Sequence, residues 1–164
     1  MKALYLVRHA KSSWETSGLS DEERPLMPKG IQKTKKIAAF LLEKKIKPGL
    51  IISSHAIRAY ETAKLLAKEL DYPVAKIRID RKIYDGPEDR ILEIIYGISN
   101  DINSVMIVGH NPKITDLANL FIHPGIEDMR TSAVAAISFI TEKWEEIQLK
   151  ESVLDFYIYP RLLT

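Results

Sequence analysis

Short apolar segments alternate along this chain with longer amphipathic ones, and this order restricts the fold more than any other feature. Residues 2–8, 50–53 and 104–109 are rich in branched or aromatic residues and predict buried strands. Residues 28–49 and 54–70 predict amphipathic helices, the second of them capped by Ser53 or Ser54. Apolar strands separated by such helices predict a mostly parallel sheet that is covered on both faces.

The remaining segments complete the expected sheet. A third strand is predicted over 75–79, a helix over 88–97, and another helix from 113 to Leu120. A strand near 133–140 and a last strand at 144–149 are expected to form an antiparallel edge, and Tyr157 and Tyr159 also alternate as in an edge strand. We therefore predict a three-layer α/β/α sandwich with a mostly parallel central sheet and an antiparallel edge strand.

Length and composition set further limits. The 164 residues match one domain, predicted over 1–164, and the net charge of +2, from 24 basic and 22 acidic residues, favours neither nucleic acid nor a membrane surface as partner. Cysteine is absent, which removes disulfides and thiolate sites. The apolar run 3–7 is too short for a secretory or membrane segment, and we expect a cytoplasmic protein.

Polar residues stand where three of the predicted strands end. Arg8 and His9 close the first strand, Arg58 lies near the start of the helix after residues 50–53, and His110 follows residues 104–109 directly. In open α/β sheets, ligands bind beyond the carboxyl ends of the strands. Each of these residues could also be an ordinary strand-end or solvated helix residue, but their joint placement favours one pocket.

Such a set of side chains suits phosphoryl transfer. The planar guanidinium of arginine binds phosphoryl oxygens through two parallel hydrogen bonds. A neutral imidazole can attack phosphorus and carry the group, while a second imidazole donates to another oxygen.

At this point the residues resemble a family. The segment "LYLVRHAKSSW" resembles the Arg-His signature of the histidine phosphatase superfamily, which is also called phosphoglycerate mutase-like. The segments "RPLMPKGIQ", "IISSHAIRAYETA" and "VMIVGHNP" resemble three further motifs of that family in the same order. The resemblance extends from residue 3 to about residue 118 and implies the phosphoglycerate mutase-like fold.

The resemblance implies roles for individual residues. His9 would be the nucleophile, and Arg8, Arg58 and His110 would complete the phosphate pocket. Ser12 and Asn111 match substrate-binding positions. The implied mechanism has two steps, attack by His9 and then hydrolysis, and needs no metal and no cofactor.

Departures from the family pattern carry finer information. Ala10 replaces the usual glycine, Lys11 a common acidic residue, and Glu15 an asparagine that is common among the mutases. The short chain and "RHA" resemble the small SixA-type phosphohistidine phosphatase branch. His55 stands where members often carry proline, and its role stays open.

Asp85 occupies the place of the carboxylate that protonates the leaving group in many members, although Asp85 before Gly86-Pro87 is also a common turn residue. A weak acid would favour phosphohistidine, because its phosphorus–nitrogen bond is intrinsically labile. The expected partner is therefore a phosphorylated protein, such as one of a histidine phosphorelay.

Several alternatives remain at this stage. One is a mutase, which is disfavoured because transferring the phosphoryl group back demands a closed site. The chain could hydrolyse a small phosphomonoester, or it could be a phosphate-binding module without turnover. A metal-dependent hydrolase using His9, His110 and Asp85 is a further possibility. The adjacent arginines and the absence of an HxH or HExxH motif argue against the metal.

Overall fold

The computed structural model describes residues 1–15, 17–87 and 89–163. It forms a six-stranded sheet in the order β3-β2-β4-β1-β5-β6. The strands are β1 (Lys2–Arg8), β2 (Leu50–Ser53), β3 (Arg78–Ile79), β4 (Ser104–Gly109), β5 (Val134–Phe139) and β6 (Ser152–Ile158). The α-helices are α1 (Pro28–Glu43), α2 (Ile57–Glu69), α3 (Lys82–Asp85), α4 (Arg90–Tyr96) and α5 (Lys113–Asn119), and short 3-10 turns are η1 (Asp21–Glu23), η2 (Val74–Lys76), η3 (Trp144–Glu146) and η4 (Pro160–Leu163).

Parallel pairing dominates the sheet. The pairs β1–β4, β4–β2 and β2–β3 are parallel, whereas β5 runs antiparallel to both β1 and β6. The prediction of a mostly parallel sheet with antiparallel pairing at one edge is confirmed.

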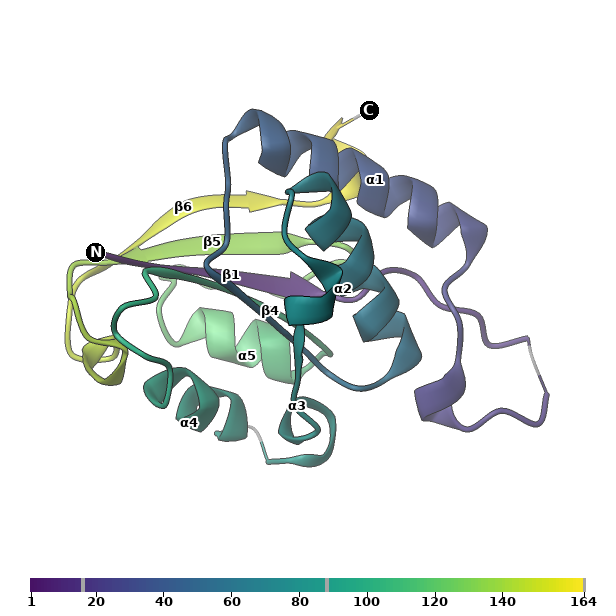
Figure 1. Cartoon of the computed structure of the whole chain (residues 1–164), viewed down its shortest axis with the longest axis horizontal. Coiled ribbons are helices and arrows are strands. Elements are labelled where there is room, and N and C mark those ends of the chain that lie inside the picture. Colours follow the sequence, from purple (N-terminus) through teal and green to yellow (C-terminus); the bar gives the residue numbers. More distant parts are fainter. Residues whose placement is uncertain (16, 88, 164) are drawn as a thin grey trace.

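Two hydrophobic cores cover the two faces of the sheet, because side chains alternate along each strand. In β4, Val105 and Ile107 belong to one core, and Met106 and Val108 belong to the other. Helices α1 and α2 pack on the Met106 side, and α4 and α5 pack on the Val105 side, so the sheet is the middle layer of three (Figure 1). The predicted α/β/α sandwich is therefore confirmed.

The structure corrects several predicted elements. Residues 144–149 do not form a strand, because the buried Trp144 starts the turn η3 and its indole nitrogen donates to the carbonyl of Ile102 at 2.8 Å. The edge strand is β6 instead, and it contains Tyr157. The predicted strand 75–79 shortens to β3 after η2, and the helix predicted over 88–97 begins at Arg90, with Glu88 outside the described residues.

Within the part of the chain that the structure describes, no helix is both long enough and apolar enough to cross a membrane.

Strand register brings the predicted site residues to one edge of the sheet. Arg8 at the end of β1 pairs with Gly109 at the end of β4, and Ser53 at the end of β2 pairs with Val108. His9, Ser54 and His110 therefore leave the sheet at the same level. The polar residues at these three strand ends therefore lie at one edge of the sheet, as predicted.

Helix α1 supports the loop after β1 through a close backbone contact at Gly30. A Cβ atom built on Gly30 would lie 2.5 Å from the carbonyl oxygen of Lys11 and 3.0 Å from its nitrogen. The neighbouring loop is further fixed by the Met27 N–H, which donates to that same carbonyl at 2.9 Å. Only glycine allows α1 to approach the loop that follows His9 this closely.

We predict that Gly30→Ala lowers the free energy of unfolding by about 1–3 kcal/mol, because the clash with backbone outweighs the higher helix propensity of alanine. Gly97→Ala is the matched control, since its Cβ would meet no heavy atom closer than 3.6 Å. Urea denaturation of both variants measures the difference. Equal stabilities would contradict the account.

Candidate active site

Four of the predicted site residues meet beyond the ends of β1, β2 and β4. The rings of His9 and His110 have centroids 5.1 Å apart, and Arg58 Nε lies 3.4 Å from His9 Nε2. His9, Arg58 and His110 are each less than one-tenth exposed. Arg8 precedes His9 and lines the same cavity. Residues from three separate parts of the sequence are thus brought together, as the strand ends predict.

The hydrogen bonds of His9 fix its tautomer. Its Nδ1 lies 2.7 Å from the carbonyl oxygen of Ala10, which can only accept, so Nδ1 carries the proton. Arg58 Nε points a donor at the other nitrogen, which therefore holds the lone pair. The backbone of Ala10 is itself held, because its N–H donates to Thr62 Oγ1 at 2.9 Å. His9 consequently presents a nucleophilic Nε2 on a rigid backbone.

Both imidazoles are held in the neutral form. Burial, together with the positive charges of Arg58, Arg8 and Arg24 and against the opposing effect of the Ala10 carbonyl, lowers the pKa of His9 to about 4. Burial, then the neighbouring His9 and Arg58, lower the pKa of His110 to about 3. A neutral imidazole has a free lone pair at neutral pH, which a nucleophile requires.

Ser54 positions His110. The Ser54 hydroxyl lies 2.8 Å from His110 Nε2 and accepts the N–H of Ala56 at 3.1 Å. The prediction that Ser53 or Ser54 caps α2 is therefore wrong: the N-cap is Ala56, and the serine hydroxyl is used in the site. Among the described residues, the buried Nδ1 of His110 has no hydrogen-bond partner. A buried polar atom left unpaired is uncommon away from functional sites.

Asp21 orients the Arg58 guanidinium. Nη2 of Arg58 donates to the Asp21 carboxylate at 2.9 Å, and Nη1 donates to the Asp21 backbone carbonyl at 2.7 Å. The hydroxyl of Tyr84 donates to the same carboxylate at 2.6 Å. This bond and then the pairing with Arg58 lower the pKa of Asp21, while Asp21 raises the pKa of Tyr84. Asp21 therefore stays ionised and Tyr84 protonated.

Arg24 is a third arginine of the site. It lines a cavity of about 480 Å³ together with Arg8, His9, Ser12 and Arg58. Its Nη2 donates to Ser12 Oγ at 2.9 Å, its side chain is 10% exposed, and its guanidinium lies 3.3 Å from the centroid of the Trp14 ring. Its Nη1 is buried without a hydrogen-bond partner among the described residues. Ser12, predicted to bind substrate, is thus placed in the cavity and bound to Arg24.

Sequence reasoning missed Asp21, Arg24, Ser54, Thr62 and Tyr84 as parts of the site. Arg24, Ser54 and Thr62 lie inside the segments that resemble family motifs, so those segments could have indicated them. Asp21 and Tyr84 lie outside the four quoted motif segments, and only the folded chain brings them to Arg58.

Asn111 is placed beside the site with its amide already bonded. Its Nδ2 donates to Asp128 Oδ1 at 2.7 Å and to the Met129 carbonyl at 2.9 Å, and its Oδ1 accepts from Thr115 at 2.7 Å. Arg8 Nη1 donates to the same Met129 carbonyl at 2.8 Å. Asn111 therefore fixes the loop that holds Arg8, and its predicted contact with substrate stays a prediction.

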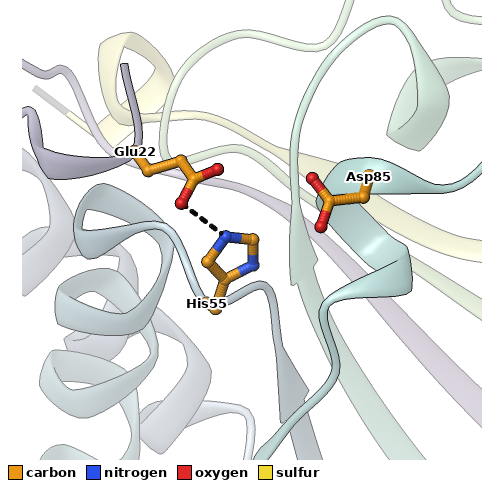
Figure 2. A group of neighbouring side chains, drawn as sticks. All are labelled: Glu22, His55 and Asp85. Atoms are coloured by element: carbon orange, nitrogen blue, oxygen red, sulfur yellow. Dashed lines mark ion pairs between the residues drawn. The ribbon is translucent and has the colours of Figure 1, made fainter. Parts of the chain in front are cut away.

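Asp85 lies apart from the His9 cavity. It is the last residue of α3, is half-exposed, and lies 3.6 Å from Arg81 Nε. Figure 2 shows its carboxylate facing His55, with Glu22 on the other side of the imidazole. These three side chains could together hold a cation, since their ligand atoms lie within 4.8 Å of one another. The structure does not pair Asp85 with His9 or His110.

The fold and the site define a class of protein. A neutral imidazole with a fixed lone pair, three arginines and a second imidazole lie at the carboxyl edge of a parallel sheet, an arrangement suited to chemistry on a phosphoryl group.

Comparison with known proteins agrees with this class. The model of the histidine phosphatase superfamily, branch 1, matches residues 4–83. A chloroplastic uncharacterized protein of Arabidopsis thaliana is 31% identical over 153 residues, covering 88% of this chain and 70% of that protein. An uncharacterized protein of Mycobacterium leprae is 25% identical over 94% of this chain and 100% of its own length. The chain belongs to the histidine phosphatase superfamily, and it is a phosphatase by class.

Solved structures share the whole fold. The protein histidine phosphatase SixA complexed with tungstate superposes with a TM-score of 0.83 at 19% identity, covering 99% of both chains. A candidate phosphohistidine phosphatase SixA from Agrobacterium tumefaciens gives a TM-score of 0.80 at 25% identity, over 97% of this chain and 98% of the other. The predicted phosphoglycerate mutase-like, SixA-type fold is confirmed.

The low pKa values of the two histidines predict how stability depends on pH. Unfolded histidines titrate near pH 6.5, whereas the folded values are about 4 for His9 and about 3 for His110. Between these values the unfolded chain binds more protons, so the free energy of unfolding falls as the pH drops from 6.5 toward 4.

We predict that lowering the pH from 7 to 5 costs about 1–2 kcal/mol for each of these histidines. Urea denaturation at both pH values should show a smaller loss for His9→Gln than for the wild type. The control His123→Gln, at an exposed histidine, should show the wild-type loss. The same pH dependence in His9→Gln and wild type would contradict neutral burial of His9.

Proposed function

We propose that the protein is a metal-independent phosphatase that forms phosphohistidine on His9 and that its substrate is protein phosphohistidine. The observation that carries the proposal is the hydrogen bond from His9 Nδ1 to the Ala10 carbonyl, which leaves Nε2 as a neutral nucleophile in a pocket of arginines. The SixA neighbours support the choice of substrate, because their names describe protein histidine or phosphohistidine phosphatases.

The reaction has two steps in this proposal. In the first, the Nε2 lone pair of His9 attacks phosphorus, the Nε2–phosphorus bond forms, and the bond to the substrate imidazole breaks. The departing imidazole takes up a proton from solvent water. In the second step water attacks phospho-His9 and the phosphorus–nitrogen bond breaks. Inorganic phosphate is released, and His9 returns to the neutral imidazole.

The surrounding cations are proposed to bind the phosphoryl oxygens. Arg8, Arg24 and Arg58 line the cavity around His9 and match the negative charge of a phosphoryl group. Asp21 fixes the orientation of Arg58 before substrate arrives, so little conformational entropy is lost on binding. His110 is proposed to donate a hydrogen bond to a phosphoryl oxygen, since its ring lies next to that of His9.

The carboxylates of the site favour a phosphorus–nitrogen substrate over an ester. Asp21 is ionised and bonded to Arg58 and Tyr84, so it is a poor proton donor. Asp85 is turned toward Arg81 and His55. An alkoxide leaving group needs a positioned acid, whereas the imidazole of phosphohistidine leaves more readily. Asp85 is therefore not proposed as the acid for this substrate.

The surroundings of the pocket suit a protein substrate. A second cavity of about 570 Å³ shares Arg8 and Thr131 with the first and is also lined by Tyr157 and Tyr159. The two adjoining cavities provide room for the chain segment on either side of a phosphorylated histidine.

No catalytic metal is proposed at His9. Three arginines line the cavity, and their charges oppose the approach of a divalent cation to the imidazole pair. Their guanidinium groups supply the positive charge that metal ions supply in other phosphatases.

We expect the wild type to dephosphorylate a histidine-phosphorylated phosphocarrier protein faster than p-nitrophenyl phosphate, with or without EDTA. His9→Ala should reduce turnover of both substrates by at least about 1,000-fold, because the nucleophile is removed. His123→Ala, at an exposed histidine outside the cavity, should retain full activity.

Other outcomes of this assay separate the alternatives. Faster turnover of the ester would support a small-molecule phosphomonoesterase. Tight phosphate binding without turnover of either substrate would support a binding module, and loss of activity with EDTA would contradict metal independence.

We predict that Arg24→Gln raises the inhibition constant of tungstate by about 10-fold to 100-fold, since it removes a charge-assisted hydrogen bond to the anion. Arg90→Gln is the control, because Arg90 is exposed and pairs with Glu93 on α4. An unchanged inhibition constant in Arg24→Gln would show that Arg24 does not bind the phosphoryl group.

A further inference from the structure

We propose that Glu22, His55 and Asp85 form a binding site for a divalent metal ion of the zinc type at the rim of the phosphate pocket. This site is separate from the pair His9 and His110. It goes beyond the proposed phosphatase activity, because the ion would have no part in the attack by His9.

The three side chains come from separate segments and converge on one point. Glu22 lies in η1, His55 lies in the loop between β2 and α2, and Asp85 ends α3. Figure 2 shows the His55 imidazole between the two carboxylates. His55 Nε2 lies 3.0 Å from Glu22 Oε2, and one potential ligand atom from each residue lies within 4.8 Å of the others.

These separations suit coordination of one ion. Zinc binds imidazole nitrogen and carboxylate oxygen at about 2.0–2.2 Å, so two ligand atoms on the same ion stand roughly 3–4 Å apart. Small rotations of the carboxylates would bring all three residues into that range, because Glu22 and Asp85 are 39% and 50% exposed. Their exposure also leaves room for water as a further ligand.

The state of His55 points independently to a ligand. Its side chain is only 12% exposed, its buried Nδ1 has no hydrogen-bond partner among the described residues, and its Nε2 has the Glu22 carboxylate at 3.0 Å. Buried polar atoms without partners cost free energy. A metal ion bound to one nitrogen would satisfy it, and the two carboxylates would balance the charge of a divalent cation.

In the structure, the Arg81 guanidinium provides positive charge beside the carboxylates of Glu22 and Asp85. Its Nη2 lies 3.9 Å from Glu22 Oε2 and its Nε lies 3.6 Å from Asp85 Oδ2. The Arg81 side chain is 65% exposed, so it can move into solvent when an ion binds. The Arg81 guanidinium and the metal ion therefore compete for the carboxylates of Glu22 and Asp85, and removal of Arg81 should strengthen metal binding.

An ion at this site would join η1 to α3 beside the phosphate pocket. Asp21, which holds Arg58, directly precedes Glu22 in η1. The Tyr84 ring contacts both His55 and His110, with centroid distances of 5.1 Å and 5.3 Å. The site lies next to the groups that orient Arg58 without containing any of them.

Titration calorimetry of the full chain with Zn²⁺ in phosphate-free buffer tests the proposal. We expect one equivalent to bind the wild type and His9→Ala alike. His55→Gln, Asp85→Asn and Glu22→Gln should each weaken binding by about 10-fold or more, because a ligand is lost. The matched controls His123→Gln and Asp89→Asn should bind as the wild type does, and Arg81→Gln should bind about fivefold more tightly.

Several results would overturn the proposal. These are absence of saturable Zn²⁺ binding, unchanged binding in the three ligand variants, loss of binding in His9→Ala, or tighter binding of Mg²⁺ than of Zn²⁺. Weaker binding in Arg81→Gln would contradict the competition between Arg81 and the ion. The titration contains no substrate, so its outcome is independent of whether the phosphatase proposal holds.

Discussion

The hydrogen bond between His9 Nδ1 and the Ala10 carbonyl is the interaction on which the chemistry of this site depends. It selects the tautomer that leaves the lone pair on Nε2, and burial keeps that nitrogen unprotonated at neutral pH. The bond requires a fixed Ala10 backbone, and Thr62 of α2 accepts the Ala10 N–H. The close packing of Gly30 against Lys11 then fixes the next residue of the same loop.

The sheet supplies the rest of the site through register. The parallel alignment of β1, β2 and β4 ends three strands at one level, so residues far apart in sequence meet without a long loop. Asp21 and Tyr84 complete the arrangement by orienting Arg58. Positive charge is therefore concentrated locally, although the whole chain carries a net charge of only +2.

Sequence reasoning could predict what depends on periodicity and on strand ends. The buried strands β1, β2 and β4, and the meeting of His9, Arg58 and His110, follow from apolar runs that stop at polar residues. It could not predict η3, because residues 144–149 have the local pattern of a strand. The turn depends instead on the indole hydrogen bond from Trp144 to Ile102, which joins distant segments. For the same reason sequence reasoning assigned Ser53 or Ser54 to a helix cap, while a tertiary hydrogen bond places the Ser54 hydroxyl against His110.

The most direct test of the central claim is to trap the phosphorylated enzyme. The wild type would be mixed with a radiolabelled phosphohistidine protein, quenched within milliseconds in alkali, and mapped by mass spectrometry. The account predicts an acid-labile, alkali-stable phosphoryl group on His9 that decays to inorganic phosphate. A phosphoryl group on another residue, or turnover with no label on the enzyme at any time, would contradict it.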